Sequence, residues 1–508
     1  MSAYFRLASR FRSCAKGTCT PASAPSLHFS TWRTKIVNEA EYGSSATLLG
    51  CKTLKKNFWQ QAGFNSGEVW RAVKKGFGDN RFPPVKAIRS PFARGKVTNS
   101  LNAEGFSSSA ALYSPIAMGV SETGRKQVAT WLGLGSGWVF ALVVLGGVTR
   151  LTRSGLSMTE WKFTGERPPI NADDWEAEFE KYRASPEFKQ VHSTMTIEEF
   201  KFIYWMEYGH RMWARALGVV FAVPAAYFAL RGYVNGALAK RLGLLFLMGG
   251  SQGLVGWWMV RSGLRDPAET DNPHAAPRVS PYRLAGHLAS AFAIYSLLTW
   301  TTLSMSMPAP ALAAFREQPA VMAAARGLRR AVHPLAGLIG VTALSGAFVA
   351  GNDAGRAYNT FPTMNGAWVP EEYFEAPRGW LRNCFENTAA VQLHHRVLAL
   401  STAAGTLAVW AYGSRLPLPA PTRACLHLLL AGTAAQVTLG ISTLLTYVPV
   451  SLGAAHQAGA LGLFTAALGL MHTLRPPAAR PPSAARAAMF PAAVAAVVAV
   501  GAAVSQQE

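Results

Sequence analysis

Four histidines of this 508-residue chain have the type and spacing that iron chemistry requires. His210, His287, His395 and His456 each lie near the start of a long apolar segment. Neutral imidazole is a good axial ligand for iron, and two imidazoles on facing helices can hold a haem between them. A single histidine in a membrane segment is more often a packed or hydrogen-bonded residue, but four at a similar depth favour two bis-histidine haem sites. The other seven histidines are not assigned to iron: His28, His192, His274, His333, His394, His427 and His472.

A carboxylate lies one turn from the first of these histidines. Glu207, His210 and Arg211 stand at i, i+3 and i+4, so they share one face of a helix. One interpretation is an ion pair with Arg211 that lowers the cost of burying charge. The other is proton transfer, or stabilisation of positive charge at a reacting carbon. Glu207 is the only acidic residue inside the predicted spans, and it lies beside a predicted iron ligand. We therefore predict the catalytic role.

The elements that must position these residues are membrane-spanning helices. The chain is 50% hydrophobic and 15% charged, and its apolar residues gather in runs of the roughly 20 residues that a bilayer crossing needs. Eight such runs predict an all-α polytopic membrane protein, with spans near 128–148, 205–230, 241–260, 284–305, 331–350, 390–413, 424–445 and 452–473. A ninth span at 487–504 is an open alternative, because alanine drives insertion weakly and Pro491 interrupts the run.

Spans one to four and five to eight resemble two copies of one unit. The second span opens with GHRMWARALG (209–218), and the sixth with HHRVLALSTAAG (394–405). The third and seventh spans each place a glutamine four residues before a glycine (Gln252 and Gly256, Gln436 and Gly440). The fourth contains GHLASAF where the eighth contains AHQAGAL. We therefore predict two pseudo-symmetric four-helix bundles, 127–306 and 330–474, related by an axis along the membrane normal.

The net charge of +22 is concentrated at the N-terminus, which carries 19 Lys/Arg and 6 Asp/Glu in residues 1–126. Residues 1–38 hold basic residues among serines and no acid, which is typical of a mitochondrial presequence; a disordered basic tail is the alternative. We interpret 39–126 as a weakly ordered matrix segment and 475–508 as a C-terminal tail. Nothing in this distribution indicates nucleic-acid binding.

Loop charge predicts the orientation in the membrane. The loops at 231–241, 306–330 and 414–423 are net basic, and basic loops stay on the side from which helices insert. Both termini should therefore face the mitochondrial matrix. The five cysteines form no C-x-x-C or C-x-x-C-H motif, which disfavours covalent haem attachment and a thiolate zinc cluster.

The external loops and histidine segments resemble the heme A synthase family. The resemblance covers about 128–474 and rests on GGVTRLTRSGLSMTEWKFTGERPP (146–169), EYGHRMWAR (207–215), GLVGWWMVRSGL (253–264), AGNDAGRAYNTFPTMNGAWVP (350–370) and the two later histidines. It implies oxidation of a ring methyl of heme O, in two two-electron steps, to the formyl group of heme A for cytochrome c oxidase. Some bacterial members carry a cysteine pair in the first external loop. Residues 149–203 contain no cysteine, so the chain resembles the mitochondrial branch.

The resemblance also implies roles for the candidate residues. His395 and His456 would hold a resident heme b. His210 and His287 would face the substrate heme O, with Glu207 completing the catalytic set. A ferredoxin-type redox partner, cytochrome oxidase assembly factors and a mitochondrial inner-membrane location are implied as well.

Three arginines of the external loops are candidates for binding haem propionates. Arg150, Arg153 and Arg356 could supply the cationic partners that propionates need, or they could contact lipid headgroups like other interfacial arginines.

Two alternative functions use the same ligands. A diheme electron-transfer cytochrome needs the four histidines but no reactive carboxylate, and a haem carrier or chaperone binds without turnover. A prenyltransferase that makes heme O is disfavoured, since it would need aspartate-rich motifs and Asp353 stands alone in its loop.

Overall fold

The computed structural model describes residues 114–476, apart from residue 163, residues 266–275 and residue 316. The predicted presequence (1–38), the C-terminal tail and the ninth span (487–504) lie outside the described residues. Of the segment 39–126, only 114–126 is described, and it leads into a helix that begins at Glu122.

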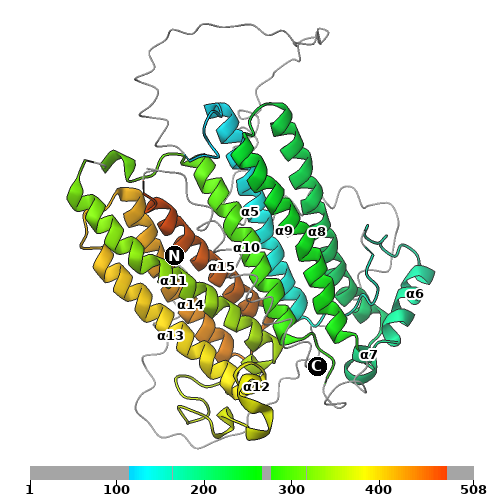
Figure 1. Ribbon diagram of the computed structural model, residues 1–508. Coiled ribbons are helices and arrows are strands. Elements are labelled where there is room, and N and C mark those ends of the chain that lie inside the picture. The colour runs from blue at the N-terminus through cyan, green and yellow to red at the C-terminus, as the bar shows by residue number, and fades with distance from the viewer. Residues whose placement is uncertain (1–113, 163, 266–275, 316, 477–508) are drawn as a thin grey trace, which may run out of the picture. The chain divides into compact units, whose positions relative to one another are not determined.

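Eight long helices match the eight predicted spans, which confirms the all-α membrane fold (Figure 1). They are α5 (Glu122–Leu151), α8 (Ile197–Leu230), α9 (Gly236–Gly263), α10 (Pro281–Ser306), α11 (Pro319–Gly351), α13 (Thr388–Gly413), α14 (Ala420–Leu445) and α15 (Val450–Thr473). Seven of them are long and apolar enough to cross a membrane. The eighth, α13, is equally long, but it carries Gln392, His394, His395 and Arg396 near its start, which lowers its hydropathy.

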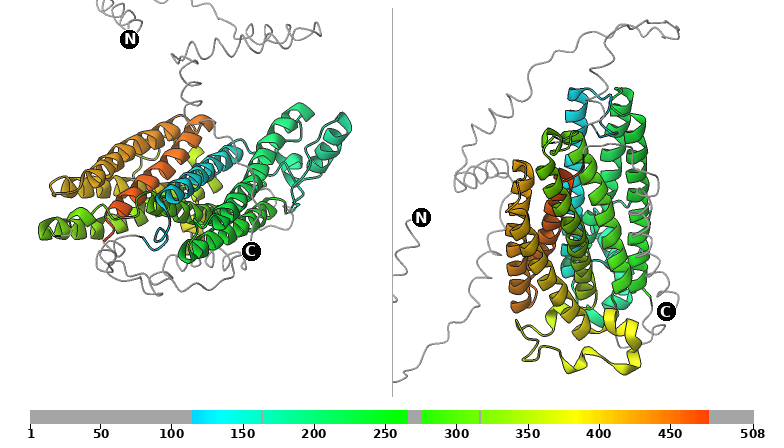
Figure 2. Two further views of the ribbon diagram at one scale, coloured as in Figure 1. Left: turned by 90° about the horizontal axis from the view of Figure 1, so that it is seen from above. Right: turned by 60° about the vertical axis from the view of Figure 1, so that its left-hand side comes forward.

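The long helices form two four-helix bundles (Figures 1 and 2). In the first bundle α5 packs against α8 and α10, and α9 packs against the same two helices. The second bundle repeats this arrangement, with α11 and α14 each packed against α13 and α15. Between the bundles, α5 contacts α15 and α10 contacts α11. Exchanging α5 with α11 and α10 with α15 maps these contacts onto themselves, as the predicted pseudo-twofold requires.

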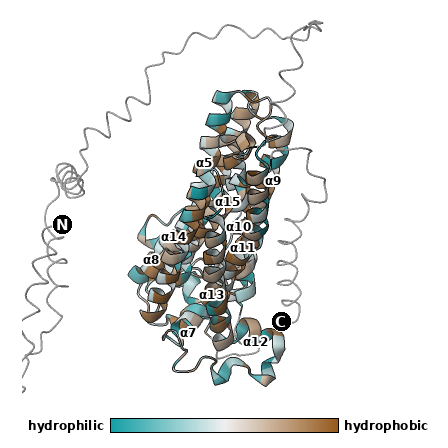
Figure 3. Ribbon diagram, turned by 90° about the vertical axis from the view of Figure 1, so that its left-hand side faces the viewer, coloured by the Kyte–Doolittle hydropathy of each residue, from teal (hydrophilic) through white to brown (hydrophobic). Residues whose placement is uncertain are grey.

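Each bundle has its own apolar core. Leu132, Leu238 and Leu298 lie in the core of the first bundle, and Leu328 and Leu426 lie in that of the second. Figure 3 shows apolar residues along the helices and hydrophilic residues at the ends and in the loops. Many apolar side chains also point outward, including Val223, Leu247 and Leu428, with 64%, 68% and 60% of their surface exposed. An exposed apolar surface of this extent suits contact with lipid.

Local signals fix where the histidine-bearing helices begin. Thr196 and Glu199 form a reciprocal capping box at the start of α8, and Asn387 accepts hydrogen bonds from the first amides of α13. Pro281 occupies the first turn of α10, where its missing amide costs nothing. These starts place His287, His395 and His456 about two turns inside their helices.

The two long loops, between α5 and α8 and between α11 and α13, contain short helices that the sequence pattern did not predict. The first loop forms α6 (Ala172–Arg183) and α7 (Pro186–Val191), whose aromatic residues pack on the start of α8. The second loop contains α12 (Gly379–Glu386) and the 3-10 turns η3 (Ala354–Arg356), η4 (Glu371–Tyr373) and η5 (Ala376–Arg378). A further turn, η2 (Ala313–Phe315), lies between the bundles in sequence. The asparagine cap before α6, Asn171, is the sequence signal that could have identified the first of these helices.

Candidate functional site

The second bundle brings two of the four predicted histidines face to face. The ring centroids of His395 on α13 and His456 on α15 are 6.4 Å apart, and the rings are inclined at 83°. Two metal–nitrogen bonds of about 2 Å each, together with the two ring radii, require a centroid separation of roughly 6 Å. The pair therefore fits two axial ligands on one iron.

The first bundle places His210 on α8 and His287 on α10, the helices that correspond to α13 and α15. The helix contacts of the first bundle place these two histidines as those of the second place His395 and His456. Within the described residues, no group of three or more His, Cys, Asp or Glu side chains is placed so that it could hold a metal ion. Each pair thus offers two protein ligands, as haem iron requires, because the porphyrin supplies the other four.

Every one of the four imidazoles lies against a glycine of a neighbouring helix. A Cβ built on that glycine would come within 3.1, 3.1, 3.4 and 2.9 Å of the Cε1 atom of His210, His287, His395 and His456, respectively. The glycines are Gly146, Gly256, Gly346 and Gly440. An added Cβ would crowd the imidazole most at Gly440, at 2.9 Å, and least at Gly346, at 3.4 Å, so these glycines help to set the ring positions.

Paired glutamines contact the histidines of α10 and α15. The amide nitrogen of Gln252 lies 3.2 Å from Nδ1 and 3.0 Å from the backbone oxygen of His287. The amide nitrogen of Gln436 lies 3.1 Å from Nδ1 and 2.9 Å from the backbone oxygen of His456. An amide nitrogen can only donate, so each glutamine donates toward Nδ1 and the backbone oxygen of its histidine and holds that ring in place. The repeated glutamines were recognised in the sequence as part of the duplication, but their contact with the histidines was not predicted.

Glu207 is buried, with 3% of its surface exposed, and it accepts three hydrogen bonds. Its Oε1 accepts from Arg211 at 2.7 Å, as the ion-pair interpretation predicts. Its Oε2 accepts from the Ser157 hydroxyl and the Met158 amide, both at 2.8 Å. Arg211 in turn donates to the backbone oxygens of Met158 and Glu160 at 2.9 and 2.8 Å. The carboxylate and the arginine therefore fasten the loop after α5 to α8.

The second bundle has the same tether with an amide in place of the carboxylate. Gln392, His395 and Arg396 repeat the spacing of Glu207, His210 and Arg211. Gln392 Oε1 accepts from Arg396 at 2.9 Å, while its Nε2 donates to the oxygen of Ala354 at 2.7 Å. A neutral side chain is thus sufficient to hold an external loop, and the negative charge is particular to the first bundle.

Two of the three candidate propionate-binding arginines converge on Asp353. Arg150 Nη2 lies 3.2 Å from Oδ1 of this aspartate, and Arg153 Nη2 lies 3.7 Å from its Oδ2. Arg150 also donates to the oxygen of Ala350 at 2.8 Å. Arg356 is exposed one turn further along the second loop. The ion pairs join the two bundles at the end that carries the long loops, and binding of propionates by these arginines stays a prediction.

The described histidines that were not assigned to iron have other contacts. His394 lies 3.0 Å from the Tyr373 hydroxyl, His427 lies 3.0 Å from Trp410 Nε1, and His472 lies 3.3 Å from the Ser304 hydroxyl. His333 lies 2.7 Å from the oxygen of Arg329. His28 and His274 lie outside the described residues.

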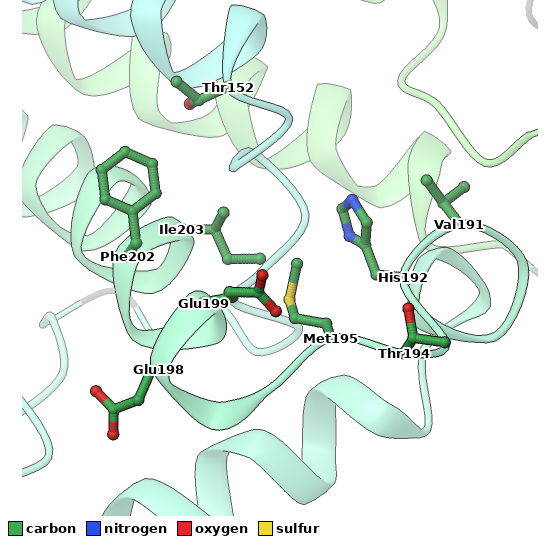
Figure 4. Close-up of a pocket in the computed structure, with 9 residues that line it drawn as sticks. All are labelled: Thr152, Val191, His192, Thr194, Met195, Glu198, Glu199, Phe202 and Ile203. Atoms are coloured by element: carbon green, nitrogen blue, oxygen red, sulfur yellow. The ribbon is translucent and has the colours of Figure 1, made fainter. Parts of the chain in front are cut away.

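A pocket of about 540 Å³ opens between the end of α5, the end of α7 and the start of α8 (Figure 4). His192 lines it and lies 2.6 Å from the hydroxyl of buried Tyr182, which donates to Glu187 at 3.3 Å. Burial raises the pKa of Glu187 to about 7 and lowers the pKa of His192. Burial also raises the pKa of Tyr182, so the phenol stays protonated at neutral pH. This polar cluster belongs to the external loop and is separate from the histidine pairs.

Comparison with known proteins identifies the family. The model described as "cytochrome oxidase assembly protein" matches residues 129–468. A protein named heme A synthase COX15 from Arabidopsis thaliana is 54% identical over 359 residues, which are 70% of this chain and 77% of the relative. The protein of that name from Homo sapiens is 46% identical over 357 residues, 70% of this chain and 84% of the relative.

A bacterial relative extends the match. A protein named heme A synthase from Nitrosospira multiformis is 46% identical over 352 residues, which cover 69% of this chain and 94% of the relative. No solved structure matches the chain. The resemblance predicted from the loop and histidine motifs is confirmed, and the chain belongs to the cytochrome oxidase assembly protein family that includes the heme A synthases.

Proposed function

We propose that this protein is a heme A synthase, which oxidises a ring methyl of heme O to a formyl group through successive two-electron steps. The product, heme A, would serve cytochrome c oxidase. The names of the relatives and the description of the family support this assignment. Converting a methyl to a formyl group removes four electrons in total, so the enzyme must hold heme O and exchange electrons with a redox partner.

His395 and His456 would hold a resident heme b in the second bundle. The separation of their rings and the Ser345 hydroxyl beside Nδ1 of His395 support this ligand pair. When bound, heme b supplies one-electron transfer. The contribution of the protein is to fix the two imidazoles and to exclude water from the bundle.

His210 and His287 would bind the iron of heme O in the first bundle, with Glu207 beside the reacting edge. The observation that carries this proposal is the contrast between Glu207 and Gln392, since the same tether uses an amide in one bundle and a carboxylate in the other. A carboxylate can accept a proton from the reacting group or stabilise positive charge that develops on the substrate carbon. An amide can do neither.

The remaining parts of the proposal concern surroundings and partners. Arg150, Arg153 and Arg356 would bind haem propionates at the external end of the bundles. The protein would lie in the mitochondrial inner membrane with both termini in the matrix, where a ferredoxin-type partner exchanges electrons with it. Cytochrome oxidase assembly factors are further candidate partners.

The test is to purify the full chain in detergent, extract its haems and identify them by mass. Heme b and heme A or heme O should be found together, and addition of heme O with a reduced ferredoxin and air should increase heme A. His395→Ala or His456→Ala should remove the stable b-type spectrum, whereas His210→Ala should leave much of it and abolish heme A formation.

Three results would contradict parts of the proposal. Two tightly bound b-type haems with no conversion of heme O would indicate an electron-transfer cytochrome. Binding and release of heme O without oxidation would indicate a haem carrier. Loss of the b-type spectrum in His210→Ala, with retention in His395→Ala, would exchange the two sites.

A further inference from the structure

The two bundles differ in what lies behind the imidazoles of His395 and His210. These histidines occupy matched positions, and each ring packs on a matched glycine, Gly346 or Gly146. The residue before that glycine is Ser345 in the second bundle and Leu145 in the first. This difference bears on how firmly each site holds its iron, and the inference rests on the function proposed above.

Ser345 fixes both the tautomer and the direction of the His395 ring. Its hydroxyl oxygen lies 2.7 Å from the backbone oxygen of Thr342 and 2.7 Å from His395 Nδ1. A hydroxyl has one proton to donate, and the carbonyl oxygen can only accept it. The serine oxygen therefore accepts a hydrogen bond from Nδ1–H, which leaves the lone pair of Nε2 free for iron.

His210 has no such support. Its buried Nδ1 atom has no hydrogen-bond partner among the residues that the structure describes. The matched residue, Leu145, has an apolar side chain that cannot accept a proton. Within the described residues no hydrogen bond therefore directs Nδ1 of His210, and the ring packs against Gly146.

We propose that Ser345 is a positioning residue that keeps His395 on the resident haem, and that Leu145 makes His210 the exchangeable ligand. An imidazole that donates from Nδ1 is a stronger and better-oriented ligand than one that does not. A synthase must release its product while it retains its electron-transfer haem. The serine and the leucine, at one matched position, provide that difference.

The experiment measures haem dissociation from the full-length protein in detergent, using an excess of apomyoglobin to capture released haem. Ser345→Ala should accelerate loss of the resident b-type haem by roughly 10- to 100-fold, the usual effect of removing a partner of a metal-bound histidine. It should also raise the midpoint potential of that haem, because the imidazole donates less electron density to iron. Ser345→Thr keeps an acceptor oxygen and should restore both values.

The reciprocal variant is Leu145→Ser, with Leu145→Ala as its matched control. The serine should slow release of heme O from the first bundle, while alanine, which removes the same apolar bulk without adding an acceptor, should not. The resident haem should be unaffected by both.

The outcomes separate this inference from the proposed function. Loss of the b-type haem in His210→Ala but not in His395→Ala would refute the assignment of the two sites. If His395→Ala does remove that haem, unchanged dissociation and potential in Ser345→Ala would refute the role of Ser345. Failure of Ser345→Thr to restore the potential would also refute it, since packing rather than the hydrogen bond would then be responsible. Equal rates of heme O release from Leu145→Ser and Leu145→Ala would refute the proposal that Leu145 makes His210 the exchangeable ligand.

Discussion

Three donors surround the carboxylate of Glu207. Its partners are the Ser157 hydroxyl, the Met158 amide and the Arg211 guanidinium. The Met158 amide and the Arg211 guanidinium can only donate. A glutamine at this position must therefore turn its own NH₂ group either toward Arg211 or toward Ser157 and the Met158 amide, and in each case it meets a donor. The charge of Glu207 therefore has two proposed roles, holding the loop after α5 and acting in the reaction. A variant is needed that separates these two roles.

We predict that Glu207→Gln keeps the resident haem and lowers the rate of heme A formation by about 10² or more, the scale of a positioned acid or base. A mismatched hydrogen bond should cost about 1–3 kcal/mol of stability. Ser157→Ala is the matched control, because it removes one hydrogen bond from Glu207 but leaves the charge in place. The measurements are haem content per protein and the heme O to heme A ratio. Equal loss of heme A in both variants would show that Glu207 acts only as a tether.

At the scale of elements, glycines decide how closely neighbouring helices approach the histidine rings. Gly440 on α14 faces His456 on α15, whereas Gly462 on α15 has no atom within 4 Å of an added Cβ. A methyl group added at Gly440 therefore meets the His456 ring, whereas one added at Gly462 meets open space.

We predict that Gly440→Ala displaces the His456 ring and lowers the content of b-type haem, because the added Cβ would lie 2.9 Å from Cε1. Gly462→Ala should leave haem content unchanged, since nothing lies near its added Cβ. Absorption spectra of the two purified variants, normalised to protein, provide the comparison. Wild-type haem content in Gly440→Ala would show that α14 can shift enough to accommodate the added Cβ without displacing His456.

The first external loop is an element whose stability should depend on pH. The folded pKa of Glu187 is about 7 against 4.5 for the free side chain, so its contribution is complete below pH 4.5 and is lost as the pH rises to about 7. Its charged surroundings are Arg150, Arg153 and Glu207, and Tyr182 donates to it. His192 acts in the opposite direction, because its lowered pKa favours the neutral ring and stability falls as the pH drops below 6.5.

In the wild type, protection of α6 and α7 from hydrogen exchange should fall as the pH rises from 4.5 to about 7. We predict that Glu187→Gln removes this fall. The amide stays neutral throughout and can still accept from the Tyr182 hydroxyl, while the titration of His192 remains in both proteins. The measurement is hydrogen exchange of residues 172–191, corrected for the intrinsic dependence of exchange on pH. The same slope in variant and wild type would mean that Glu187 ionises without consequence for the loop.

At the scale of the whole molecule, adjacent glycines of α5 face different bundles. Gly146 lies against the His210 ring of the first bundle. Gly147 lies against Gln457 of the second, which directly follows His456 and donates to the oxygen of Val143 at 2.8 Å. The histidine sites of the two bundles are therefore connected through a single turn of α5.

We predict that Gly147→Ala destabilises the contact between the bundles by about 1–3 kcal/mol, the usual cost of overpacking, because it displaces Gln457. Gly146→Ala should instead perturb His210 and the binding of heme O, with less effect on the interface. Thermal unfolding in detergent and haem binding distinguish the variants. Unchanged unfolding of Gly147→Ala would show that the interface does not depend on Gln457.

The sequence by itself determined the helices, the duplication and the matched depth of the four histidines. These properties are local: a run of apolar residues specifies a span by its length, and a repeated motif places His210 and His395 at the same point of two similar helices. The same holds for the pairing of Glu207 with Arg211, since a spacing of four residues lies within one helix.

Only the tertiary structure decided which groups surround those histidines and that carboxylate. Ser157 reaches Glu207 across 50 residues, and Arg150 reaches Asp353 across 203. Ser345 reaches His395 across 50 residues, while Nδ1 of His210, beside Leu145, has no hydrogen-bond partner in the described part of the chain. A hydrogen bond depends on placement to within a few tenths of an ångström, and that placement follows from the packing of separate helices and loops rather than from the spacing of residues along the chain.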